Sequence, residues 1–134
     1  MKRYHCATEL AVDLIGGKWK PVILAHLKEG AHRYGELRRR VPGVSEKMLT
    51  QQLRELAADG LVRRVEFDDR VPRVEYHLTA VGEELRPALT ALYEWGERRA
   101  AERGITFEPP AGQRGSVESR RRSSASRRSP QNRR

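Results

Sequence analysis

The spacing of apolar residues predicts three short helices in the first part of the chain. Apolar side chains recur at helical spacing in residues 8–15, 18–29 and 34–41, and each stretch is followed or closed by glycine or by a Pro-Gly pair. Thr8 is the expected cap of the first helix. Pro21 suits the first turn of the second, because its missing N–H needs no partner there.

Residues 45–59 have the clearest helical pattern. Leu49, Leu53 and Leu56 lie at positions i, i+4 and i+7, which places them on one side of a helix. Ser45 is a good N-cap, because its hydroxyl can accept a hydrogen bond from a free amide of the first turn. The pattern therefore predicts an amphipathic helix that ends at the glycine following it.

Two strands and a terminal helix are predicted next. Residues 61–67 alternate in part and residues 71–78 alternate well, and the polar segment 68–70 between them predicts a hairpin turn. Residues 79–103 return to helical spacing. Pro87 should either kink this helix or begin a second segment after a short first one.

This order of elements is typical of a winged helix-turn-helix. The predicted fold class is α+β, mostly α, with a two-stranded wing and terminal helices left over for dimerisation. An α-helix fits the major groove of B-DNA, and a flanking hairpin can reach the backbone or the minor groove. Element order alone leaves a generic α+β domain without a nucleic-acid role as an equal alternative.

The polar side of the 45–59 helix favours DNA binding. When residues are placed at 100° steps, the side opposite the leucines carries donor side chains of the kind that contact base edges and phosphates. They are Lys47, Gln51 and Arg54, with Thr50 on a flank. The hairpin adds the arginines of the wing, Arg63, Arg64, Arg70 and Arg73, although two aspartates stand at its tip.

Composition and charge divide the chain in two. The 134 residues carry a formal net charge of +9, but residues 109–134 hold eight Arg and one Glu, so the rest is nearly neutral. That terminal stretch has almost no apolar residues, which predicts disorder. We therefore predict a DNA-binding domain at 1–104 and a basic Ser/Arg-rich tail at 105–134. The tail could be a non-specific DNA arm, an RNA-binding or phosphorylatable segment, or a dispensable extension.

Several classes of protein are not expected. No apolar run approaches the roughly 18 residues of a membrane span, and acidic residues interrupt what would be a signal-peptide core. The single cysteine excludes an intrachain disulfide and favours a reducing, cytoplasmic setting. The four histidines lack metal-ligand spacing, and no catalytic constellation is visible. We therefore expect no enzyme activity, no metal and no cofactor.

Several segments together resemble the HxlR-type family of bacterial winged-helix transcriptional regulators, which is related to the MarR group. The matching segments are Cys6, 15–19, 34–38, 45–56, 60–62 and 72–79. The resemblance implies a cytoplasmic homodimer that binds pseudo-palindromic operators in double-stranded DNA. It also implies a dimer interface between the terminal helices, which by position and apolarity would contain Leu10, Leu14, Leu89, Leu92 and Trp95.

The candidate DNA-binding residues combine the predicted helix face, its flanks and the wing. They are Ser45, Lys47, Thr50, Gln51, Gln52, Arg54, Arg70 and Arg73. Gln52 stands where family members often carry Arg, so the resemblance leaves the operator sequence open. An RNA-binding or protein-interaction module built on the same fold remains the alternative function.

Cys6 occupies the position where the family usually has an N-terminal cysteine, which in some members senses electrophiles, quinones or oxidants. A helix N-terminus and nearby cations favour the thiolate that such chemistry requires. Lys2, Arg3 and His5 are close in sequence. An inert thiol packed at the dimer interface is the alternative.

Overall fold

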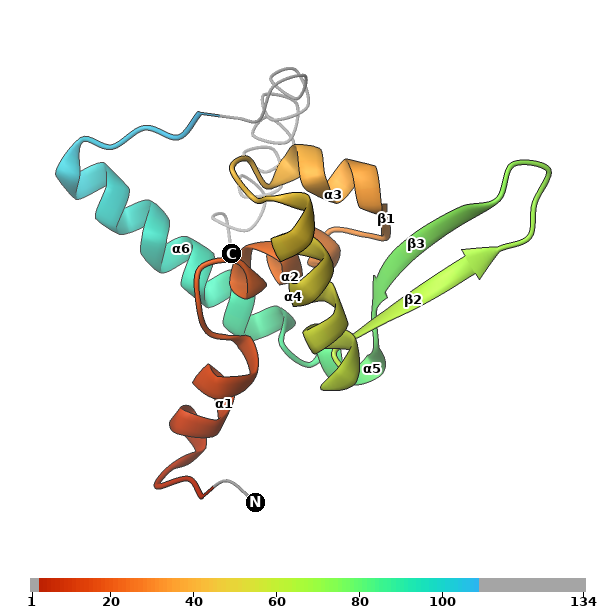
Figure 1. Cartoon of the computed structure of the whole chain (residues 1–134). Coiled ribbons are helices and arrows are strands. Elements are labelled where there is room, and N and C mark those ends of the chain that lie inside the picture. The colour runs from red at the N-terminus through yellow and green to blue at the C-terminus, as the bar shows by residue number, and fades with distance from the viewer. Residues whose placement is uncertain (1–2, 109–134) are drawn as a thin grey trace, which may run out of the picture.

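A computed structural model of the chain describes residues 3–108, and it is mostly helical with one small antiparallel sheet (Figure 1). The elements in chain order are α1 (Ala7–Ile15), α2 (Lys20–Lys28), β1 (His32–Arg33), α3 (Tyr34–Arg40), α4 (Glu46–Ala58), β2 (Val62–Phe67), β3 (Arg73–Leu78), α5 (Ala80–Glu83) and α6 (Arg86–Arg103). The α+β prediction and the winged helix-turn-helix order are confirmed. The predicted disorder of the basic tail falls outside the described residues from position 109 onwards.

The core is a cluster of leucines and other aliphatic side chains where α2, α3 and α4 meet the base of the sheet. Leu49, Leu53 and Leu56 of α4 are at most 2% exposed, and they pack with Leu24 of α2 and Leu37 of α3. The predicted apolar stripe of α4 is therefore its buried side. Ser45 caps the helix as expected, because its Oγ accepts a hydrogen bond from the Met48 amide at 3.0 Å.

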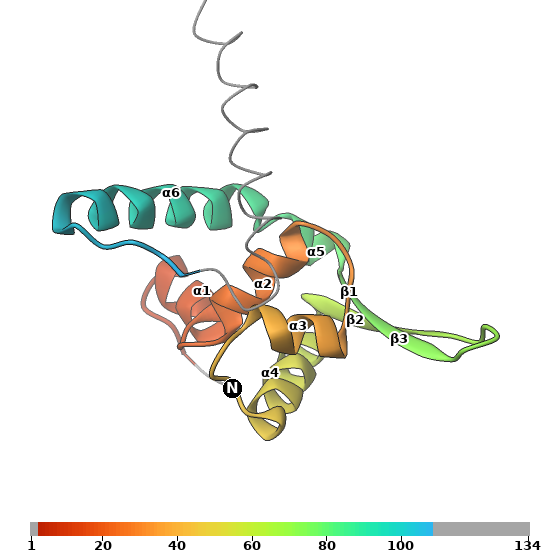
Figure 2. The ribbon, with the colours of Figure 1, turned by 90° about the horizontal axis from the view of Figure 1, so that it is seen from above.

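The wing is the hairpin of β2 and β3, which extends away from the helices (Figures 1 and 2). Its register pairs Val62 with Leu78 and Phe67 with Arg73. A third strand, β1, pairs with β3 on its other side and places His32 opposite Tyr76. Sequence patterning missed β1, because a strand of two residues carries no periodicity.

Two helix starts bear on the sequence predictions. One contradicts the predicted cap of the first helix, and the other decides between the two alternatives for Pro87. The prediction that Thr8 caps the first helix is wrong: Cys6 holds the N-cap position, and its carbonyl accepts the Glu9 amide at 3.1 Å. At the other end, Pro87 begins a new segment and does not kink a continuous helix. The short α5 is capped by Thr79, and α6 starts with the proline in its first turn.

The two terminal helices lie at the periphery. In Figure 2, α6 runs along the side of the molecule opposite α4, with α2 between them. α1 projects from the body and buries none of its residues (Figure 1). Within residues 3–108, no helix combines the length and apolarity needed to cross a membrane.

The start of α5 sits directly on the backbone of the 61–62 segment, and this contact requires glycine at position 82. A Cβ on Gly82 would overlap the carbonyl oxygen of Leu61 and would lie 3.3 Å from Leu78 Cδ2. At Gly35 of α3, by contrast, an added Cβ would lie 3.6 Å from Arg39 Nη1, which is an ordinary van der Waals contact.

We predict that Gly82→Ala lowers the free energy of unfolding by about 1–3 kcal/mol, because the backbone must shift to admit the methyl group. Gly35→Ala is the control, and it should be neutral or stabilising by up to about 1 kcal/mol, as expected for a helical glycine. Urea unfolding followed by circular dichroism measures both. Equal effects of the two substitutions would show that the Leu61 contact is not restrictive.

Candidate nucleic-acid interface

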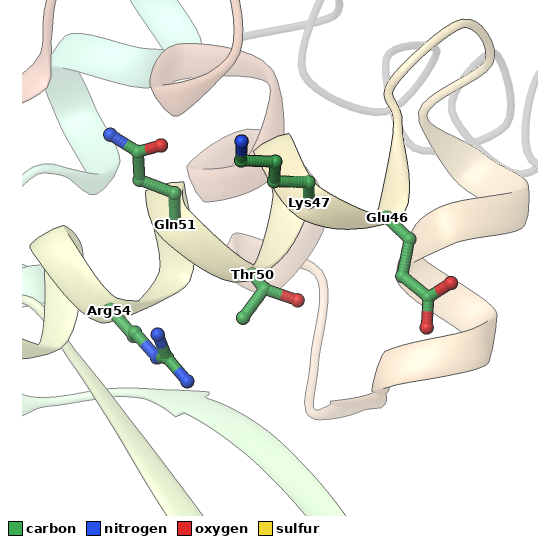
Figure 3. Close-up of a pocket in the computed structure, with 5 residues that line it drawn as sticks. All are labelled: Glu46, Lys47, Thr50, Gln51 and Arg54. Carbon is green, nitrogen blue, oxygen red and sulfur yellow. The ribbon is translucent and has the colours of Figure 1, made fainter.

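The outward side of α4 forms an open hollow of about 340 Å³ (Figure 3). Within residues 3–108, the residues that line it all belong to this helix: Glu46, Lys47, Thr50, Gln51 and Arg54. Lys47, Gln51 and Arg54 are exposed, and Thr50 is half-buried. The structure thus brings the four predicted donors of this helix to one surface, because burying the leucines turns the other side of α4 to solvent.

Thr50 and the start of α4 are held by a tyrosine from the preceding helix. The Tyr34 hydroxyl donates to the Glu46 carbonyl oxygen at 2.9 Å and lies 3.1 Å from the Thr50 hydroxyl. Arg38 adds a longer contact, 3.9 Å from the Glu46 carboxylate. The sequence analysis did not single out Tyr34, although an aromatic residue at the start of a helix-turn-helix unit was the available signal.

Gln51 is held at the other end of the hollow by a carboxylate and a lysine. Its Nε2 donates to Glu55 Oε2 at 3.1 Å, and Lys20 Nζ donates to Glu55 Oε1 at 2.7 Å. The hydrogen bond from Lys20, followed by that from Gln51, holds the pKa of the Glu55 carboxyl below its usual range. Lys20 is 8% exposed, and its link to α4 was missed because 35 positions separate it from Glu55.

Two predicted DNA-binding residues lie beside the hollow and do not line it. Ser45 is exposed at the N-terminus of α4, but its hydroxyl is occupied by the Met48 amide. Gln52 is half-buried, and its amide points at the Met48 sulfur at 3.5 Å. Any contact they make with a partner would therefore come from the edges of the α4 surface.

Some arginines of the wing form ion pairs with neighbouring carboxylates and others do not. Arg73 forms ion pairs with Asp69 and, at 3.2 Å, with Glu75, and its guanidinium lies 4.1 Å from the centroid of the Phe67 ring. The hydrogen bond from Arg73 is the main cause that lowers the pKa of Glu75. Arg73 therefore organises the wing, and Asp69 is partly neutralised by it.

Arg70 at the wing tip is exposed and has no ion pair within the described part of the chain, and the same holds for Arg63. Arg64 pairs with Glu66. The wing thus offers Arg70 and Arg63 as cations that no neighbouring carboxylate holds.

The residues predicted for a dimer interface divide between the surface and the core. Leu10 of α1 and Leu92 and Trp95 of α6 are 41%, 54% and 53% exposed. Leu14 is half-buried. Leu89, also predicted for the dimer interface, is 4% exposed and packs in the core of its own protomer, so it has little surface left for a second copy.

Cys6 is exposed at the N-terminus of α1. The neighbouring His5 contacts Glu9, with its backbone amide 3.0 Å and its Nδ1 3.3 Å from Glu9 Oε2. Among residues 3–108, no group of three His, Cys, Asp or Glu side chains is arranged to hold a metal ion.

Comparison with known proteins agrees with this architecture. The model of the HxlR-like helix-turn-helix family matches residues 14–103. The uncharacterized HTH-type transcriptional regulator YtcD of Bacillus subtilis is 47% identical over 95 residues, covering 71% of this chain and 75% of YtcD. An uncharacterized HTH-type transcriptional regulator of Methanothermobacter thermautotrophicus is 48% identical over 94 residues, covering 70% of this chain and 72% of that protein.

Among solved structures, the redox regulator HypR in its oxidized form superposes with a TM-score of 0.67 at 45% identity, over 69% of this chain and 96% of HypR. The residues that match the family model span the helix-turn-helix unit, the wing and α6. The chain therefore belongs to the HxlR-like helix-turn-helix family of DNA-binding transcriptional regulators, and not to a family of enzymes.

Proposed function

We propose that the protein regulates transcription as a homodimer that recognises a specific operator, with α4 inserted into the major groove. The observation that carries this proposal is the outward side of α4, where Lys47, Thr50, Gln51 and Arg54, four of the described lining residues of the hollow, can donate hydrogen bonds. Gln and Arg are side chains that discriminate between base pairs in the major groove, while Lys and Thr also contact phosphates.

The wing would contribute contacts that position the protein on the duplex. Arg70, exposed and unpaired among the described residues, is the best placed for a phosphate or a minor-groove edge. Arg73 would contribute mainly by holding the wing in shape through its two carboxylates and the Phe67 ring. For a two-fold symmetric dimer, the two half-sites should lie about 34 Å apart along the DNA, one helical turn.

We predict that Gln51→Ala and Arg70→Ala weaken DNA binding in different ways. Gln51→Ala should reduce the ratio of operator affinity to scrambled-duplex affinity by about tenfold, the value of one bidentate base contact. Arg70→Ala should weaken binding to both duplexes equally and reduce the salt-dependence slope by about one charge.

Gel shifts at two salt concentrations, on the upstream region of the protein's own gene and with RNA as competitor, measure these effects. If Gln51→Ala leaves both affinity and preference intact, α4 is not the recognition helix. Preferential binding of the RNA competitor would contradict operator recognition altogether.

The dimer is supported by the apolar surface that the terminal helices leave exposed. α1 buries none of its residues within the protomer, and both Leu10 and Val12 are more than 40% exposed. On α6, Leu92 and Trp95 lie on the same side of the helix and are more than half exposed. A second copy of these two helices would remove this surface from water, which is the usual driving force for association.

We predict that Leu92→Lys shifts the protein from dimer to monomer, because it places a charge in the proposed contact. Glu97→Gln is the matched control: it raises the net charge by the same amount at an exposed position on roughly the opposite side of α6. Sedimentation equilibrium measures the oligomeric state of both variants. A monomeric wild type, or a Leu92→Lys variant that stays dimeric, would contradict this interface.

The proposed signal is oxidation or alkylation of Cys6. Cys6 is exposed at the N-cap of α1, a helix of the proposed dimer surface, and the structurally similar HypR is a redox regulator. Because the chain has one cysteine, a disulfide must join Cys6 to a second copy or to a small thiol. Two thiols then give one disulfide, and the oxidant takes up the two electrons and two protons. A covalent group at this position would alter how α1 packs against its partner.

We predict that oxidant treatment changes operator affinity in the wild type and that a dithiol reductant restores it. Cys6→Ser should bind the operator like the reduced wild type and should not respond. Non-reducing electrophoresis in parallel distinguishes a dimer-linking disulfide from a mixed disulfide. A Cys6→Ser variant with the full oxidant response would exclude Cys6 as the sensor.

A further inference from the structure

Lys20 lies at a position in α2 that is unfavourable for a lysine in two respects. It is the first residue of α2, where the helix dipole disfavours a cation. It is also 8% exposed, and an ammonium group removed from water must be paired to be tolerated. The partner is Glu55 on α4, whose Oε1 lies 2.7 Å from Lys20 Nζ. The ion pair therefore links the N-terminus of α2 to α4, the proposed recognition helix.

Glu55 divides its two oxygens between two partners. Oε1 accepts from Lys20, and Oε2 accepts from Gln51 Nε2 at 3.1 Å. A carboxylate can only accept hydrogen bonds, whereas a side-chain amide has a donor end and an acceptor end. Gln51 must therefore turn its nitrogen to Glu55, and Figure 3 shows its carbonyl oxygen on the side of Lys47.

We propose that Lys20 and Glu55 are positioning residues that fix the orientation of the Gln51 amide and so determine which base Gln51 prefers. The inference rests on the proposed function, in which Gln51 lies in the major groove. Without Glu55, the amide could turn over and present donor and acceptor in either order. With it, one order is selected before DNA binds, which reduces the conformational entropy lost in the complex.

The fixed orientation corresponds to one base. With one N–H of Nε2 donated to Glu55, Gln51 retains its carbonyl oxygen and a second N–H. This is the acceptor and donor pair that contacts adenine N6 and N7 in the major groove. We therefore infer an adenine preference at the base pair that Gln51 contacts. The ionised state of Glu55 that this requires is present at neutral pH, since its pKa is held below the usual range by its partners.

The test measures base preference at a single operator position. That position is identified as the one where Gln51→Ala loses discrimination, using duplexes with each of the four base pairs. Wild type should favour A·T there by about tenfold. Glu55→Gln, which can donate as well as accept, and Lys20→Met, which removes the ammonium, should both reduce this ratio to near that of Gln51→Ala. Their salt-dependence slopes should stay unchanged, because neither residue is proposed to contact a phosphate.

Three further variants separate positioning from a general loss of structure. Lys28→Met is the matched control, because Lys28 is a half-buried lysine at the other end of α2 and donates to Thr90 of α6 at 3.2 Å; its base preference should be that of wild type. Lys20→Arg retains a donor and a charge and should restore most of the preference. Adding Glu55→Gln to Gln51→Ala should cause no further loss of preference.

The outcomes are distinct. If Glu55→Gln is folded by circular dichroism and retains the full preference at the Gln51 position, the positioning role is wrong while operator recognition stands. An additive loss in the Gln51→Ala, Glu55→Gln double variant overturns it as well. If Gln51→Ala itself changes no base preference, the recognition-helix assignment fails, and the positioning role fails with it.

Discussion

The burial of one leucine stripe determines the arrangement of the functional surface. Leu49, Leu53 and Leu56 are at most 2% exposed, and they lock the rotation of α4 about its own axis against α2 and α3. Because an α-helix has 3.6 residues per turn, this one constraint turns Lys47, Gln51 and Arg54 to solvent together. A shift of the stripe by one residue would rotate the polar surface by about 100° and direct it toward other elements.

The core fixes the rotation of α4, and polar contacts then fix the positions of individual side chains on its outward side. Tyr34 holds Thr50 near the start of α4, and the Lys20–Glu55 pair holds Gln51 farther along. The net charge of +9 says little about the surface of α4, because most of that charge comes from residues 109–134, outside the described structure. The proposed DNA-binding surface depends on where a few donors point. The wing carboxylates pair with arginines that would otherwise add nonspecific positive charge.

Local patterns in the sequence predicted local features of the fold. The stripe of α4, its Ser45 cap and the hairpin all follow from spacing within a few residues. The prediction that Thr8 caps α1 was wrong because the helix begins earlier, at Ala7, and the carbonyl of Cys6 accepts the amides of Glu9 and Leu10. Leu89 was predicted to lie in the dimer interface, because apolarity alone does not tell whether a side chain is buried within one protomer or between two. The contact between Lys20 and Glu55 could not be predicted, since it depends on how α2 and α4 pack. The Arg73–Glu75 ion pair could have been predicted from the sequence, because alternate residues of a strand lie on the same face.

Two copies of α4 are proposed to contact the major groove one helical turn apart. Methylation interference on the operator tests this arrangement directly, since a methyl group on guanine N7 projects into the major groove and one on adenine N3 into the minor groove. We expect two clusters of N7 interference whose centres lie about 10 base pairs apart and are related by the two-fold symmetry of the operator. A single uninterrupted cluster, or interference confined to adenine N3, would contradict it.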